Sequence, residues 1–263
     1  MNHLDLFSGI GGFSYGFSIA NCGINTIAHC EIDEYCQKLL QQKYPNATLY
    51  KDVREIGRGG GYIDDIDIIT AGFPCQDLSI AGNKAGLGGK RSGLFYETIR
   101  IAKQTKPKFI LYENSPELIR RDNYREAFVK ELQAIGYDVW WQLLCASYFG
   151  LPHKRERAYI LCWQSSSDTD SKRQLCFESF QYHYSKQNTP KPSKEIISLC
   201  SEYRRQQSTR DYVVDCADIR GIDGFPTMLH RVKALGNSII PTIATIYALT
   251  MVDMEAGEPI YKK

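Results

Sequence analysis

The stretch Asp5-Leu6-Phe7-Ser8-Gly9-Ile10-Gly11-Gly12-Phe13 reads as a strand that runs into a glycine turn and then into a helix. Glycine lets the backbone pass close under a ligand, and a helix amino terminus offers unpaired N–H groups. The dinucleotide fingerprint is not matched, because Ser14 stands at its third glycine position. Glu31 follows at the end of a second strand, where an acid can bind ribose hydroxyls. The turn alone fits a purely structural role equally well, but together with Glu31 it predicts a nucleoside cofactor.

The first 163 residues alternate between strand-like and helix-like patterns. Helical patterns such as Glu34–Tyr44 and Tyr124–Ile135 lie between short apolar runs. This alternation predicts an α/β fold, with a doubly wound, mostly parallel sheet that carries helices on both faces. Motifs that follow strand carboxyl ends then lie where ligands bind in open α/β sheets. The expected strands are Leu4–Phe7, Ile24–His29, Ile66–Ala71, Phe109–Tyr112 and Ala158–Trp163.

The composition changes at Gln164, after which the chain is rich in serine, glutamine, tyrosine and charge. We expect residues 1–163 to form the catalytic and cofactor-binding domain and residues 164–230 a small, irregular second domain. A strong helical pattern returns at Ile239–Met251, with Ser238 as its expected N-cap. Residues 231–263 are therefore expected to return to the first domain as a helix.

Size and composition are those of an ordinary globular protein. The chain has 263 residues, 43% of them hydrophobic and 24% charged, and its net charge of +2 does not by itself indicate a polyanion-binding protein. No apolar run approaches the roughly 20 residues that cross a bilayer. Nine scattered cysteines without a paired framework indicate reduced thiols and a cytoplasmic location. The five histidines show no ligand spacing, so no metal is expected.

A second motif, Gly72-Phe73-Pro74-Cys75-Gln76-Asp77-Leu78-Ser79, follows one of the expected strands. Most unpaired cysteines are small buried hydrophobic residues. Cys75 differs because Pro74 stiffens its turn and its other neighbours are polar, which favours a nucleophile. The next segment, Gly82–Gly93, contains Lys84, Lys90 and Arg91 and no acid. It suits a lid that closes over a phosphate backbone and favours the thiolate, although a solvated basic loop is the alternative.

Two further sites carry charge next to expected strands. Glu113 directly follows Phe109–Tyr112, where a carboxylate can be held in a cleft, although a surface acid is the more common outcome for such a motif alone. Arg155 and Arg157 precede the last strand at alternate positions, which would place both guanidinium groups on the same side. Two guanidinium groups on one side suit a phosphate or a developing negative charge.

These motifs, taken in order, resemble those of the DNA (cytosine-5) methyltransferases across nearly the whole chain. Asp5–Phe13 resembles the first cofactor motif of the family, and Gly72–Ser79 resembles its Pro-Cys motif. The remaining resemblances are Arg91–Phe95 to the block that follows, Glu113-Asn114 to the glutamate motif, Lys154–Arg157 to the Arg-x-Arg motif and Gly236–Pro241 to the last motif. The resemblance implies a Rossmann-like methyltransferase that uses S-adenosylmethionine and releases S-adenosylhomocysteine.

The resemblance also implies roles for individual residues. Cys75 would attack C6 of a flipped-out cytosine, and Glu113 would hold N4 and N3 of the ring. Arg157 would contact the ring oxygen, and Arg155 would support Cys75 or a phosphate. Phe7 would stack near the adenine, Glu31 bind the ribose, Asp52 the amine, and Asn237 close the methionine end. The expected cofactor contacts are Phe7, Ser8, Gly9, Gly11, Gly12, Glu31, Ile32, Asp52, Val53, Pro74, Asn237 and Ser238, and the expected DNA contacts are Gln76, Ser79, Lys84, Lys90, Arg91 and Lys154.

The region left for target recognition is short, and it resembles that of compact phage or prophage members, whose chain likewise runs into Leu-Gly-Asn before the final helix. Double-stranded DNA is the expected partner, the chain is expected to be a monomer, and a cognate restriction endonuclease is a candidate partner. Three alternatives stay open. These are a non-catalytic DNA-binding relative, a nucleotide-dependent oxidoreductase on the same fold, and a metal-dependent base deaminase, whose ligand spacings the chain lacks.

Overall fold

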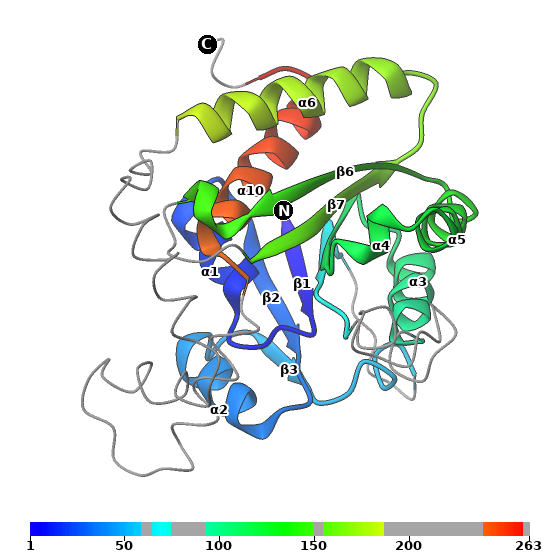
Figure 1. The fold of residues 1–263 in the computed structure, drawn as a ribbon. Helices are drawn as coiled ribbons and strands as arrows, with labels where there is room; N and C mark the ends of the chain where they lie inside the picture. Colours follow the sequence, from blue (N-terminus) through cyan, green and yellow to red (C-terminus); the bar gives the residue numbers. More distant parts are fainter. Residues whose placement is uncertain (59–64, 75–92, 150–154, 187–238, 260–263) are drawn as a thin grey trace, which may run out of the picture.

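The computed structural model describes residues 1–58, 65–74, 93–149, 155–186 and 239–259. Its centre is a seven-stranded sheet in the order β3-β2-β1-β4-β5-β7-β6 (Figure 1). The strands from β3 to β5 run parallel, and β7 runs antiparallel to both β5 and β6. The predicted mostly parallel α/β sheet is confirmed. Its strands are β1 Asn2–Leu6, β2 Asn25–Cys30, β3 Thr48–Tyr50, β4 Ile68–Ala71, β5 Phe109–Asn114, β6 Tyr137–Cys145 and β7 Glu156–Gln164.

Helices cover both faces of the sheet, so each face has its own hydrophobic core. On one face, Leu4 and Leu6 of β1 pack with α3, α4 and α5. On the other, Ile68 of β4 and Leu111 of β5 pack with α1, α6 and α10. The described helices are α1 Gly12–Ala20, α2 Glu34–Lys43, α3 Leu94–Thr105, α4 Glu117–Arg120, α5 Asp122–Gln133, the 3-10 helix η2 Ala146–Phe149, α6 Thr169–Ser185 and α10 Pro241–Ala256.

Helix α1 packs directly against α10, although the two lie more than 200 residues apart. A Cβ atom on Gly16 would come within 2.5 Å of both the Ala244 Cβ and the Pro241 carbonyl oxygen. The Thr245 hydroxyl donates a hydrogen bond of 2.8 Å to the Gly16 carbonyl oxygen. Since real Cβ atoms do not approach other atoms so closely, glycine is required at this crossing.

The prediction that Ser238 caps the last helix is wrong. The helix begins at Pro241, and its N-cap is Ile240, which makes no side-chain capping bond. Proline suits the first helical position because its missing N–H would have no partner there.

The segment after β7 forms a long helix, α6, which packs against the last helix, α10. Buried Asp253 of α10 accepts a 2.6 Å hydrogen bond from the Ser179 hydroxyl of α6. Nε2 of His183 lies 2.9 Å from the same carboxylate oxygen. Residues 169–185 thus pack on α10, while the proposed 164–230 domain and its boundaries stay a prediction.

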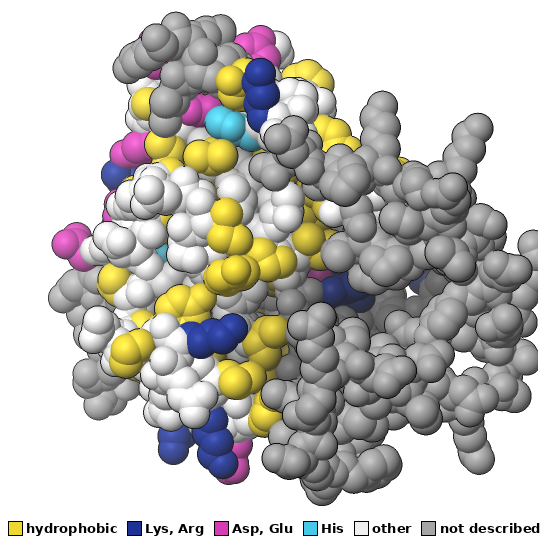
Figure 2. Space-filling view, turned by 90° about the vertical axis from the view of Figure 1, so that its left-hand side faces the viewer, with side chains coloured by type: hydrophobic (Ala, Val, Ile, Leu, Met, Phe, Trp, Pro, Cys, Tyr) yellow, Lys and Arg dark blue, Asp and Glu magenta, His cyan; other side chains and the backbone are white. Residues whose placement is uncertain are grey.

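The side of the molecule on which α1 and α2 lie carries a broken run of hydrophobic side chains among polar ones (Figure 2). Tyr15 and Ile19 of α1 are each 53% exposed, and the Lys43 ammonium lies 6.0 Å from the Tyr15 ring centroid.

None of the helices in the described part of the chain is long and apolar enough to span a membrane.

Candidate active site

The order of the strands reverses between β1 and β4, because the chain first builds β2 and β3 on one side and later β5 on the other. The carboxyl ends of β1 and β4 border the crevice where open α/β sheets bind their ligands. The glycine turn follows β1 there, and Phe73-Pro74 follows β4. Phe7 has φ of 56°, which is uncommon for a residue other than glycine and marks local backbone strain at this turn.

Glu31 lies at the end of β2 and closes the glycine turn. Its Oε2 accepts a 2.7 Å hydrogen bond from the Gly9 N–H, and its Oε1 accepts one of 2.8 Å from the Asp33 N–H. Gly9 has φ of 54°, and nothing lies within 4 Å of where its Cβ would be. A ligand could therefore approach the backbone closely at Gly9.

Two other residues of the turn are held by the protein itself. Ser8 is buried, and its hydroxyl donates a 2.6 Å hydrogen bond to the Asp5 carbonyl oxygen. A Cβ on Gly12 would lie 2.8 Å from the Ile239 Cβ and 2.9 Å from its carbonyl oxygen. Close packing of α1 against the residues before α10 thus accounts for Gly12.

The other residues expected near the cofactor differ in their exposure. Ile32 is 70% exposed beside Glu31, whereas Val53 is part of the core, and its carbonyl oxygen accepts from Arg100. Both carboxylate oxygens of Asp52 accept hydrogen bonds from Arg54. These hydrogen bonds lower the pKa of Asp52.

The segment that leads to Cys75 is anchored just before it. The Asn114 Nδ2 donates a 3.2 Å hydrogen bond to the Phe73 carbonyl oxygen, and its Oδ1 accepts one of 2.8 Å from the Ser115 N–H. The Phe73 ring lies 5.6 Å from that of Phe95 within a buried aromatic cluster. The sequence predicts no role for Asn114 in the site, and its position directly after Glu113 is the signal that points to one.

Glu113, Arg155 and Arg157 come together at the same edge of the sheet. Because β7 is antiparallel to β5, the start of β7 lies beside the end of β5. Arg155 Nη2 lies 3.3 Å and Arg157 Nε 3.2 Å from Oε1 of Glu113. Burial raises the pKa of Glu113, and the two nearby guanidinium groups offset this only in part, so the pKa stays above its usual value. The raised pKa favours the protonated form of this carboxyl group compared with an exposed glutamate.

Gly72 lies next to this cluster. A Cβ on Gly72 would be 3.7 Å from Oε2 of Glu113, so this oxygen faces the end of β4. The structure thus brings Glu113, both arginines and the residues before Cys75 to one place. Several expected residues lie outside the described residues, namely Cys75, Gln76, Ser79, Lys84, Lys90, Arg91, Lys154, Asn237 and Ser238.

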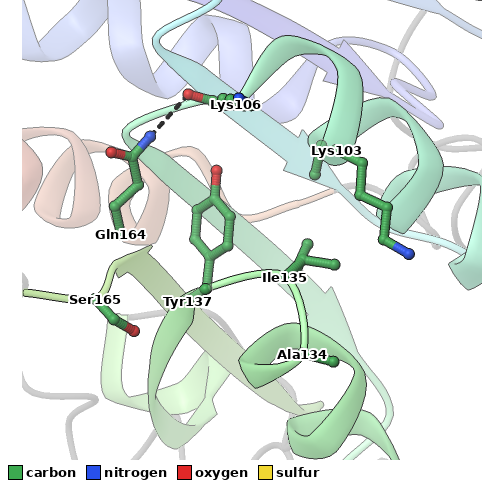
Figure 3. A pocket seen from close by; sticks show the side chains of 9 residues that line it. Lys103, Lys106, Ala134, Ile135, Tyr137, Gln164 and Ser165 are labelled. Carbon is green, nitrogen blue, oxygen red and sulfur yellow. Dashed lines mark hydrogen bonds between the residues drawn. The ribbon is translucent and has the colours of Figure 1, made fainter.

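A separate pocket of about 470 Å³ lies at the opposite edge of the sheet (Figure 3). The Tyr137 hydroxyl that lines it donates to the Pro107 carbonyl oxygen, and Gln164 Nε2 donates to the Lys106 carbonyl oxygen. These polar groups bond to the backbone before β5, so they support the fold here.

Within the described ranges, no three His, Cys, Asp or Glu residues are placed to hold a metal ion.

Residues 1–220 match the model of the C-5 cytosine-specific DNA methylases, which is more than half of the chain. The chain belongs to this family. The fold agrees, because the Dnmt2 methyltransferase of S. pombe superimposes with a TM-score of 0.65 over 97% of this chain and 99% of that one, at 15% identity.

Among the curated relatives of this chain are viral and bacterial proteins. The type II methyltransferase M.CviJI of Paramecium bursaria Chlorella virus IL3A is 41% identical over 159 residues, which is 60% of this chain and 42% of that protein. The type II methyltransferase M.HhaI of Haemophilus parahaemolyticus is 31% identical over 167 residues, 63% of this chain and 50% of that protein. The matches thus span half or less of these relatives.

Proposed function

We propose that this DNA methylase transfers a methyl group from S-adenosylmethionine to C5 of cytosine in double-stranded DNA. The observation that carries the proposal is the buried Glu113 carboxyl, held by Arg155 and Arg157 beside the residues that lead to Cys75. A carboxyl group with a raised pKa next to two cations suits a ring that gains and loses negative charge. Family membership supplies the reaction class.

The residues at the β1–α1 turn fit the methyl donor. Gly9 leaves open space above the backbone, and Glu31 lies within reach of the same turn. Ile32 offers an exposed apolar surface on which an adenine ring could lie. In this proposal Phe7, Glu31, Ile32 and Asp52 hold the nucleoside, with Asn237 and Ser238 at the methionine end. The bound donor supplies an electrophilic methyl group.

The protein must make C5 of cytosine nucleophilic, since this carbon attacks poorly by itself. In the proposed mechanism, the Cys75 thiolate bonds to C6 of the flipped base while Glu113 gives a proton to N3, which leaves C5 enamine-like. Arg157 contacts the ring oxygen, and Arg155 holds Glu113 or a phosphate. After C5 has gained the methyl group, N3 returns its proton to Glu113, the C5 proton is released to solvent, and departure of the Cys75 thiolate restores the aromatic ring.

Target recognition and partners belong to the proposal as well. We assign phosphate contacts to Lys84, Lys90, Arg91 and Lys154, base-proximal contacts to Gln76 and Ser79, and sequence recognition to part of residues 164–230. A monomer that acts in the cytoplasm, alone or beside a cognate restriction endonuclease, fits the short recognition region. Size-exclusion chromatography with light scattering would test the monomer.

The function is tested by base-resolution bisulfite sequencing of DNA from cells without cytosine methylation that express this chain. Protected cytosines in one short context are expected with the wild type and absent with Cys75→Ala. Cys22→Ala is the matched control, since Cys22 precedes β2 at the opposite edge of the sheet and burial raises its pKa. A folded wild type that binds S-adenosylmethionine yet protects no cytosine would favour a non-catalytic DNA-binding protein.

A further inference from the structure

Polar side chains form a row inside the sheet beneath the ligand crevice. Parallel strands are usually apolar on both faces. Here His29 of β2, Asp5 of β1 and Thr70 of β4 are direct register neighbours on three adjacent strands. His3 lies two residues before Asp5, on the same face of β1, and its ring is 4.7 Å from that of Phe17 in α1. The exposed fraction of all four residues is 1% or less, so their hydrogen bonds are made inside the protein.

The hydrogen bonds of this row have a fixed direction. The Thr70 hydroxyl donates its single hydrogen to Oδ1 of Asp5 at 2.6 Å. Nε2 of His3, 2.7 Å from the same hydroxyl oxygen, must therefore be the donor of that contact. Nδ1 of a neutral ring then accepts from the Thr26 hydroxyl at 2.8 Å. Burial lowers the pKa of His3 to about 4, which keeps the ring neutral at physiological pH.

Asp5 of β1 is hydrogen-bonded both to β4 and to α1. Its Oδ2 accepts a 3.1 Å hydrogen bond from the Ser14 hydroxyl, on the helix that leaves the glycine turn. Its Oδ1 is bound to Thr70, five residues before Cys75. Burial raises the pKa of Asp5, but the His29 and His3 rings and the Thr70 hydroxyl outweigh this effect. Asp5 is thus an ionised acceptor between the donor side and the nucleophile side of the site.

We propose that His3 and Thr70 are positioning residues for methyl transfer. By orienting the Thr70 hydroxyl toward Asp5, His3 fixes the spacing between the glycine turn after β1 and the Phe73-Pro74 segment after β4. This inference rests on the proposed function, because the two segments carry the methyl donor and the nucleophile. Transfer between them requires reacting atoms about 3–3.5 Å apart, and a displacement of about 1 Å can reduce the rate roughly 100-fold.

Thr70→Val tests the inference, since it removes the hydroxyl and keeps the shape of the side chain. We expect kcat to fall by roughly tenfold to 100-fold with a smaller change in KM for the methyl donor. Thr70→Ser keeps the hydroxyl and should stay within about threefold of the wild type. Thr250→Val, at an equally buried threonine of α10 that donates to the Ile246 carbonyl oxygen, is the matched control for lost stability.

The tautomer of His3 gives a readout that does not depend on activity. In a ¹⁵N-labelled protein, NMR of the histidine side chains should show that the wild-type His3 ring carries its proton on Nε2. An Nδ1-protonated ring would overturn the direction of the hydrogen bonds. If Thr70→Val does not fold, Ser14→Ala replaces it, because loss of the other bond to Asp5 should raise KM for the donor about threefold to tenfold.

The outcomes separate this inference from the proposed function. The wild type could be active while the Thr70→Val and Ser14→Ala variants keep kcat and KM but melt at a lower temperature. The row of buried polar residues would then only stabilise the fold. That result would overturn only the inference. A wild type that methylates no DNA would overturn the proposed function and the inference with it.

Discussion

Arg157 Nε lies 3.2 Å from Oε1 of Glu113, a contact that joins the start of β7 to the end of β5. Only 10% of the Glu113 side chain is exposed, compared with 34% of that of Arg157. The carboxyl group is therefore largely removed from water, while one of its cations still reaches solvent. This asymmetry explains why burial dominates the pKa of Glu113.

The raised pKa of Glu113 predicts how stability depends on pH. The folded state binds the Glu113 proton more tightly than the unfolded state, whose pKa is near 4.5. Compared with Glu113→Gln, the wild type should thus be stabilised below this pH and lose that stabilisation as the pH rises through the folded pKa. Urea denaturation of both proteins across this pH range measures the difference. Arg157→Gln should enlarge it, because that cation lowers the Glu113 pKa, and parallel curves for all three proteins would contradict the prediction.

The Asn114–Phe73 hydrogen bond predicts a specific loss of turnover. Asn114→Asp keeps an acceptor for the Ser115 N–H but places a carboxylate oxygen against the Phe73 carbonyl oxygen. We expect kcat to fall at least about tenfold, while the affinity for S-adenosylmethionine, measured by calorimetry, changes less than about threefold. Ser115→Ala removes only a weak 3.4 Å contact to the Glu117 N–H and serves as the control. Equal activity of the two variants would show that this bond does not position the segment before Cys75.

Whether Gly16→Ala raises or lowers the stability of the protein tests how closely α1 packs against α10. Alanine stabilises an exposed helix position by roughly 1 kcal/mol relative to glycine. At Gly16 the added methyl group would collide with Ala244 and the Pro241 carbonyl oxygen, so we expect Gly16→Ala to destabilise the protein by about 1–3 kcal/mol. Chemical denaturation measures this value. Ser18→Ala, on the exposed side of α1, should change stability by less than about 0.5 kcal/mol. A stabilised Gly16→Ala protein would mean that α1 and α10 pack less closely.

The last prediction concerns the contact between α6 and α10. Asp253→Ala removes the buried acceptor of the Ser179 hydroxyl and the partner of His183, and should cost about 2–4 kcal/mol of unfolding free energy. Glu255→Ala, on the same helix, breaks an exposed ion pair with Lys108 and should cost less than about 1 kcal/mol. Thermal and urea denaturation compare the two. Similar losses would show that the buried contact contributes no more than the surface one.

The sequence predicted the parts of the fold that rest on apolar runs bounded by turns. β5 and β7 were expected for this reason, and β7 extends only a few residues beyond the expected segment. β6 was missed because it has no regular alternation of buried and exposed positions. β3, with three residues, is too short to give a pattern. α6 was missed because its contact face includes Ser179 and His183, which bind Asp253 through polar bonds that apolar periodicity cannot reveal.

The candidate site, like the fold, has parts that the sequence predicted and parts that it could not. The position of Glu113 at the end of a strand could be anticipated, but its meeting with Arg155 and Arg157 at the start of β7 depends on β7 running antiparallel to β5. The bond between Asp5 and Thr70 could not be anticipated either, because it joins residues 65 positions apart and depends on the register of two strands. The roles of individual residues toward cofactor and DNA stay predictions.

The contact between Gly16 and Thr245 also bears on how the protein folds during synthesis. Gly16 of α1 leaves the ribosome well before its partner Thr245 of α10, which follows 229 residues later. At ~5–20 residues per second, the turn and α1 wait roughly 10–45 seconds for their partner. Closing so long a loop is slow, and the part of α1 that contacts α10 stays uncovered meanwhile. The helix that follows the first motif therefore completes its native packing only after α10 has been made.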